Sequence, residues 1–151
     1  MHLEGGDYAV RAAAGDRIRV IFVGNTGNAK AELAVNGTQA NVAVKDTPHG
    51  NFHATIEVPK TADLVLRLAG GNLEMAAITG NKDIESSAGN AEIGVGDSKD
   101  YSMVDASVTV GNLDGGPFGE SDGTLSHHLS WKGAGKYTLR AVLGAGNLEL
   151  K

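Results

Sequence analysis

Residues 68–95, LAGGNLEMAAITGNKDIESSAGNAEIGV, contain the pattern that decides the fold. A Gly-Asn pair occurs three times in this stretch, nine positions apart, and twice more toward the C-terminus: Gly71-Asn72, Gly80-Asn81, Gly89-Asn90, Gly111-Asn112 and Gly146-Asn147. The second residue after each Asn is acidic, namely Glu74, Asp83, Glu92, Asp114 and Glu149. The third is apolar except at Gly115, namely Met75, Ile84, Ile93 and Leu150.

A short fixed period marks a structural unit that buries its apolar face by stacking on copies of itself. Neighbouring side chains of a strand point to opposite faces, so the apolar residues should face inward and the acids outward. Gly and Asn adopt positive φ most readily, which suits a corner between strands. Nine residues then form one strand and one corner, and the eighteen from Asn72 to Asn90 form one coil.

These features predict an all-β, single-domain β-solenoid, similar to a parallel β-helix, in which Asn72 lies above Asn90. Corner residues Asn51, Asn72, Asn90, Asn112 and Asn147 are separated by 21, 18, 22 and 35 positions, the last being about two coils. Short strands with frequent turn signals describe an antiparallel β-sandwich equally well. The sandwich therefore stays open as the alternative fold.

The composition indicates one domain over residues 1–151, with residues 1–4 open to interpretation as vector-derived. The 22 glycines suit many tight corners, and the 5% aromatic content predicts a thin aliphatic core. A net charge of −5 without a basic cluster argues against a nucleic-acid partner. No apolar run approaches the ~20 residues of a membrane helix, so membrane insertion is not expected. Cysteine is absent, which excludes disulfides and thiol chemistry.

The N-terminal third carries antiparallel signals. Asn36-Gly37 is a strong hairpin signal between strand-like runs at 29–35 and 39–44. Residues 16–23 become wholly apolar after Val20, which predicts a strand buried on both faces. Residues 96–103 predict a loop or one helical turn, and no longer helix is expected. Since the ends of a stack expose backbone groups, either residues 114–131 or the hairpin at Asn36-Gly37 should cap an end.

Four sets of residues are candidates for chemistry. His49 and His53 are too far apart along a strand to share a metal, and the adjacent His127 and His128 point to opposite faces. Asp97, Asp100 and Asp105 form an acidic loop without a calcium-loop order, so whether they bind calcium stays open. The acids at 74, 83, 92, 114 and 149 resemble glycosidase carboxylates, but a solubilising outer face is the simpler interpretation.

The fourth set is aromatic. Tyr8, Tyr101, Trp131 and Tyr137 are candidate exposed aromatics for sugar stacking, although Trp131 and Tyr137 flank a turn and are better placed to cap the stack. No G-x-S-x-G motif or activated hydroxyl is present. The sequence thus predicts no catalytic, cofactor-binding or metal-binding residues, and no cofactor.

Several phrases carry a family resemblance: AGGNLEM, ITGNKDIESSAGNAEIGVGD, YSMVDASVTVGNLDGGPFG and GKYTLRAVLGAGNLEL. They resemble the bacterial adhesin-like β-strand repeat proteins of unknown function called the DUF4097 family, in the versions found in acidobacteria. The resemblance covers about residues 50–151. It implies a β-solenoid-like domain, usually on exported or envelope-associated proteins, and no enzyme activity or cofactor.

The expected function is a non-enzymatic adhesin-like or scaffold module in the periplasm or cell envelope, with a polysaccharide-binding or polysaccharide-acting β-helix protein as the alternative. No signal peptide is visible in the sequence, so export is implied by the resemblance alone. The expected partners are a surface polysaccharide or protein, and a second copy joined end to end.

Overall fold

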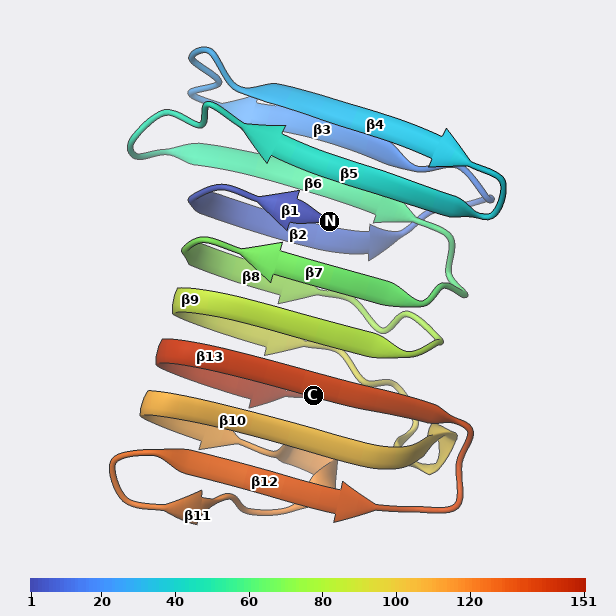
Figure 1. Cartoon of the computed structure of the whole chain (residues 1–151), viewed down its shortest axis with the longest axis vertical. Coiled ribbons are helices and arrows are strands. Elements are labelled where there is room, and N and C mark those ends of the chain that lie inside the picture. Colours follow the sequence, from blue (N-terminus) through green and yellow to red (C-terminus); the bar gives the residue numbers. More distant parts are fainter.

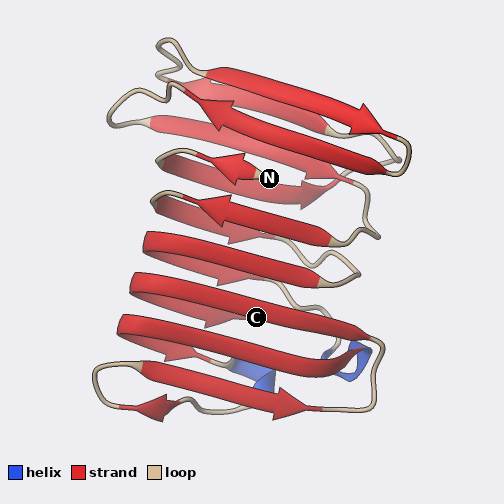
Figure 2. Ribbon diagram, viewed as in Figure 1, coloured by secondary structure: helices blue, strands red, loops and turns tan.

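The computed structural model describes residues 1–151 and is all-β, with 64% of residues in strands and 4% in helices. Thirteen strands form one mixed sheet that is not closed into a barrel and folds over itself into two facing layers (Figures 1 and 2). The strands are β1 (His2–Leu3), β2 (Gly6–Ala12), β3 (Arg19–Gly24), β4 (Lys30–Asn36), β5 (Gln39–Lys45), β6 (Phe52–Val58), β7 (Leu64–Leu68), β8 (Gly71–Met75), β9 (Lys82–Ile93), β10 (Tyr101–Asp114), β11 (Asp122–Gly123), β12 (His127–Lys132) and β13 (Tyr137–Leu150). Two single-turn 3-10 helices, η1 (Ser98–Asp100) and η2 (Gly116–Phe118), complete the structure.

Adjacent coils pair in parallel, as the repeat predicts and as an antiparallel sandwich would not. Asn72 pairs with Asn90, and Leu73, Glu74 and Met75 continue in register along β9. The long strands β9, β10 and β13 pass through both layers and turn at their Gly-Asn pairs. Met75 and Ile84 are buried, as predicted.

The order of the coils in the stack differs from their order along the chain. Figure 1 shows β13 between β9 and β10, and it pairs in parallel with both. Likewise β1 lies between β5 and β7, and β2 between β6 and β8. Both chain termini therefore occupy positions in the middle of the stack. The 35 positions from Asn112 to Asn147 cover the last coil at one end of the stack and the segment that returns from it to the middle.

The core is a continuous cluster of 30 buried residues between the two layers. It is mostly Val, Leu, Ile and Ala, because alternate residues of every strand face inward. Leu3 in β1 is part of it, so the first residues of the chain are built into the stack. No helix of the structure is long and apolar enough to cross a membrane.

The two ends of the stack are antiparallel. At one end β4 pairs with β5 through the predicted hairpin at Asn36-Gly37, and β3 pairs with β6. At the other end β12 pairs with β10, and β11 pairs with β12. There Phe118 of η2 packs against Trp131, at 4.9 Å between ring centroids, and against Tyr101 at 5.7 Å. Residues 114–131 thus cap this end, as predicted.

Two expectations about exposure are wrong. Residues 16–23 do not form a strand buried on both faces, because Ile21 and Val23 lie on the outer, solvent-facing side of β3, where they are 36% and 54% exposed. Tyr8 and Tyr101 are not exposed aromatics, because alternation turns both rings into the core. The four predicted aromatics therefore form no stacking platform. The predicted helical turn in 96–103 is confirmed as η1.

Candidate functional site

The two layers present two different outer surfaces. The ladder face, named after the row of Asn side chains along its edge, is the outer surface of β3, β6, β2, β8 and the C-terminal halves of β9, β13 and β10. The opposite face is the outer surface of β4, β5, β1, β7, the N-terminal halves of β9, β13 and β10, and β12.

Glycines form a column at the corner beside the ladder face. Gly6, Gly71, Gly89, Gly146 and Gly111 stand in register on adjacent coils. Gly89 has φ +121°, and a Cβ added there would lie 1.7 Å from the Gly71 carbonyl oxygen. Only a residue without Cβ allows the backbones to stack this closely, which explains the Gly of each pair.

The Asn that follows each glycine belongs to a hydrogen-bonded ladder. Asn112 Nδ2 donates to Asn147 Oδ1 at 3.0 Å, and Asn147 Nδ2 donates to Asn90 Oδ1 at 2.8 Å. Asn90 Nδ2 donates to Asn72 Oδ1 at 3.0 Å, and Asn72 Nδ2 donates to Asp7 Oδ1 at 2.8 Å. Each amide thus both donates and accepts in the centre of the ladder, and Asp7 ends it as an acceptor.

His53 and Asn51 lie beyond Asp7, next to the end of the ladder. His53 Nδ1 lies 3.3 Å from Asp7 Oδ2, and His53 Nε2 lies 3.3 Å from Asn51 Oδ1. The corner spacing predicts that Asn51 is equivalent to Asn72. This prediction is wrong, because His53 pairs with Asp7 and occupies that level of the column. His49 lies in the preceding loop and does not join His53.

A row of acids runs beside the ladder. Glu74, Glu92 and Glu149 stand in register on β8, β9 and β13, and Asp114 follows on β10. Arg11 Nη2 contacts Glu74 at 2.9 Å, and Lys151 Nζ contacts Glu92 at 2.8 Å. The hydrogen bond to Glu92 is the main reason that the pKa of Lys151 is raised. These partners offset the repulsion between stacked carboxylates.

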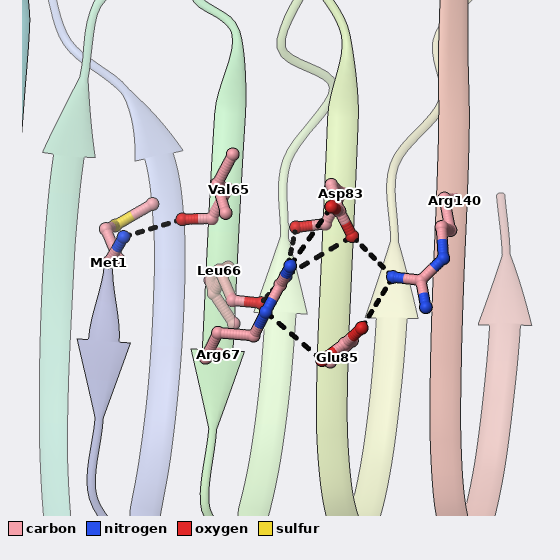
Figure 3. A network of polar contacts seen from close by, with 7 residues as sticks. All are labelled: Met1, Val65, Leu66, Arg67, Asp83, Glu85 and Arg140. Atoms are coloured by element: carbon pink, nitrogen blue, oxygen red, sulfur yellow. Dashed lines mark hydrogen bonds and ion pairs between the residues drawn. The ribbon is translucent and has the colours of Figure 1, made fainter.

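Asp83, the fifth acid of the predicted row, lies on the opposite face, because the chain changes layers at Gly80-Asn81. Figure 3 shows its ion-pair network. Arg67 Nη2 contacts Asp83 Oδ2 at 3.0 Å and Arg67 Nε contacts Glu85 at 3.1 Å, while Arg140 Nη1 bridges both acids at 2.8 and 2.6 Å. The hydrogen bond from Arg67, followed by that from Arg140, lowers the pKa of Asp83.

Lys82 is the one charged side chain within the core. It follows Asn81 directly, and that position faces inward in every repeat, as in Leu73 and Ala91. Lys82 Nζ donates to the Tyr101 hydroxyl at 2.7 Å and to the Gly80 carbonyl at 3.3 Å. Burial lowers the pKa of Lys82 to about 8 and raises that of Tyr101 to about 12.

A shallow depression of about 430 Å³ lies on the ladder face. The row of acids is interrupted at this level of the stack, because Ala9 pairs with Glu74 on one side and with Thr55 on the other. The depression forms over the small side chain of Ala9. Its rim carries carboxylates, amides and an imidazole, from Asp7, His53, Asn72, Glu74, Asn90 and Glu92. Such groups can donate and accept hydrogen bonds over an extended surface.

The other predicted clusters do not assemble. Asp97 accepts from the Lys99 N–H within η1, whereas Asp105 on β10 contacts His128 Nε2 at 3.1 Å. His127 points to the other side of its strand, with Nδ1 3.4 Å from Ser121 Oγ. No group of three His, Asp or Glu side chains has the geometry to hold a metal ion. Sequence reasoning missed the hydrogen bonds of the Asn ladder, although the recurrence of Asn at successive corners was the available signal.

Comparisons with known proteins support the fold. No protein-family model and no curated protein matches the chain, so the resemblance to the DUF4097 family stays a prediction. Among solved structures the chain is similar to a putative cell adhesion protein from Clostridium sporogenes ATCC 15579. The TM-score is 0.54 at 14% identity, over 99% of this chain and 91% of the other. At this identity the likeness shows a shared fold.

Proposed function

We propose that this chain is a non-enzymatic adhesin-like module, exported to the cell envelope, that binds a surface polysaccharide along its ladder face. The observation that carries the proposal is the pair of parallel rows, amides and acids, in strict register over adjacent coils. Rows on neighbouring strands repeat about every 4.8 Å and offer hydrogen-bonding groups to a long, hydroxyl-rich chain. The fold shared with a putative cell adhesion protein supports the same role.

A polysaccharide-cleaving enzyme is the alternative, and the surroundings of the carboxylates disfavour it. Glycoside hydrolysis needs one carboxyl that is held protonated by its surroundings and a second one across a cleft. Glu74 and Glu92 are 59% and 49% exposed, lie on the open ladder face, and are ion-paired with Arg11 and with Lys151. The acids of this row therefore have neither the buried setting nor the cleft that glycoside hydrolysis requires.

A binding assay with matched variants tests the proposal. The immobilised chain is exposed to a panel of purified bacterial surface polysaccharides, and the release of reducing ends is measured in parallel. We expect binding without release, weakened about tenfold or more by Glu92→Ala. Asp105→Ala, which removes an exposed acid with one partner from the opposite face, should leave binding unchanged. Reducing-end release, equal effects of both variants, or no binding to any polysaccharide would overturn it.

A further inference from the structure

The end of the stack formed by β3 and β4 is open. β3 pairs only with β6, and β4 pairs only with β5, so each strand has one edge of unpaired backbone groups. All seven residues of β4 are exposed. Leu33 and Val35 face the same way as the core residues of β5, yet they are 46% and 67% exposed because no further coil covers them.

Apart from the charges of Lys30 and Glu32, this edge lacks the features that protect natural edge strands. Proteins usually shorten such strands, place a proline or bulge in them, or cover them. β4 is seven residues long, has no proline and pairs with β5 without a register shift, and β3 exposes Ile21 and Val23 on its outer side. The capped end, by contrast, carries η2 with Phe118 and Trp131. The open end therefore has the character of an interface.

The register of the two layers indicates which partner fits. Ala31 continues a column through Val44, Leu3 and Leu68 to Ser86, three residues before Gly89. Ile21 continues a column through Thr55, Ala9 and Glu74 to Glu92, three residues after Gly89. Ala31 and Ile21 thus lie at equal distances from the corner, in opposite layers. A single twofold axis perpendicular to both layers can pass through both positions.

A second copy related by this axis pairs both edges at once. β4 pairs antiparallel with β4 of the second copy about Ala31, and β3 pairs in the same way about Ile21. On the outer side of β4, Lys30 of each copy then lies opposite Glu32 of the other copy, so this pair occurs twice in the dimer. On the inner side of β3, Val20 lies opposite Phe22 of the second copy. The pairing therefore combines opposite charges with apolar contacts.

We propose that two copies of this chain associate end to end through β3 and β4 in this twofold register. The interface uses the same surface of each copy, so it closes on itself. Because the far end of each copy is capped by η2 and β12, the assembly stops at two copies and does not grow into a filament. The proposal is independent of the adhesive role.

Charge reversal tests the predicted partner of Lys30. Sedimentation equilibrium of the full chain should show a dimer. Lys30→Glu and Glu32→Lys should each raise the dissociation constant about tenfold, because each places like charges across the axis twice, and the double exchange should restore it. Lys132→Glu at the capped end is the control and should leave the constant unchanged. A monomer at all concentrations, a filament, or single variants that match the control would overturn the proposal.

Cysteine substitution tests the register, since the chain contains no cysteine. In the dimer, Ile21→Cys places the thiol of one copy opposite the same thiol of the other copy. The two Cα atoms then lie within the 4.4–6.8 Å that a disulfide spans. Val23→Cys lies on the same side of the same strand and is more exposed, but its two copies would be about 13 Å apart. Mild oxidation should therefore cross-link Ile21→Cys and not Val23→Cys. Equal cross-linking of both, or of neither, would overturn the register.

Discussion

The central coils and the β3–β4 end are built from the same kinds of strands and turns, but their backbones meet different surroundings. In the centre, β9 has neighbours on both sides, and a Cβ on Gly89 would lie 1.7 Å from the Gly71 carbonyl oxygen. At the end, Gly37 turns the β4–β5 hairpin at φ +62° and has no other atom within 4 Å of a Cβ position.

The difference shows that glycine has two separate roles in this chain. At Gly37 it relieves the strain of a left-handed backbone, which is a local property of one turn. At Gly89 it also leaves room for the neighbouring coil, which is a property of the stack. Sequence patterns mark both glycines, but only the register of the coils shows that the second role exists.

The largest expected effect separates these two roles. Gly89→Ala forces two backbones apart in addition to straining φ, and we expect it to lower the free energy of unfolding by more than about 3 kcal/mol. Gly37→Ala should cost about 1 kcal/mol, which is the strain alone. Urea unfolding of both variants measures the difference. Equal losses would show that the close approach at the corner does not limit the stack.

A second prediction concerns the charge that only the central coils bury. The pKa of Lys82 is about 8 in the folded chain against 10.5 when unfolded, so between these values the unfolded state holds the extra proton. Stability should therefore rise with pH, by about 2 kcal/mol from pH 8 to 10. Above pH 10 the raised pKa of Tyr101 acts in the opposite direction, because the unfolded tyrosine ionises first.

Urea unfolding at pH 7, 8, 9 and 10 checks this rise. Lys82→Met keeps a long apolar side chain without the charge and should abolish it. Lys132→Met, which removes an exposed lysine from β12, should keep it. If Lys82→Met retained the full rise, another group would be responsible.

The central coils were also the part that the sequence predicted best. Asn72 and Asn90, Met75 and Ile84 lie where the repeat placed them, because a strand period of two and a fixed corner determine both face and level. The order of the coils could not be predicted in this way. Parallel pairing of β13 with β9 or with β10 satisfies the same pattern, so the position of Asn147 between Asn90 and Asn112 depends on long-range packing.

The errors occur where a residue's surroundings depend on its place in the stack. The apolar run ending at Val23 resembles a buried strand, but Ile21 and Val23 pair with Thr55 and His53 on the outer face of β3 and are exposed there. Asp83 follows the pattern of Glu74, but the corner at Gly80 places it in the other layer. An eighteen-residue coil has two nine-residue sides, so the spacing itself places Asp83 opposite Glu74, and the single row of five acids was inconsistent with it.

The smallest expected effect compares the middle of the Asn ladder with its end. Asn90 both donates to Asn72 and accepts from Asn147, whereas Asn112 only donates to Asn147. Since all these amides are exposed, Asn90→Ala should cost about 1 kcal/mol of unfolding free energy and Asn112→Ala about half of that. Combining Asn90→Ala with Asn147→Ala should cost less than the sum of the two single changes, because they share one bond. Strict additivity would mean that the amides stack without stabilising one another, and the ladder would then matter for the ligand rather than for the fold.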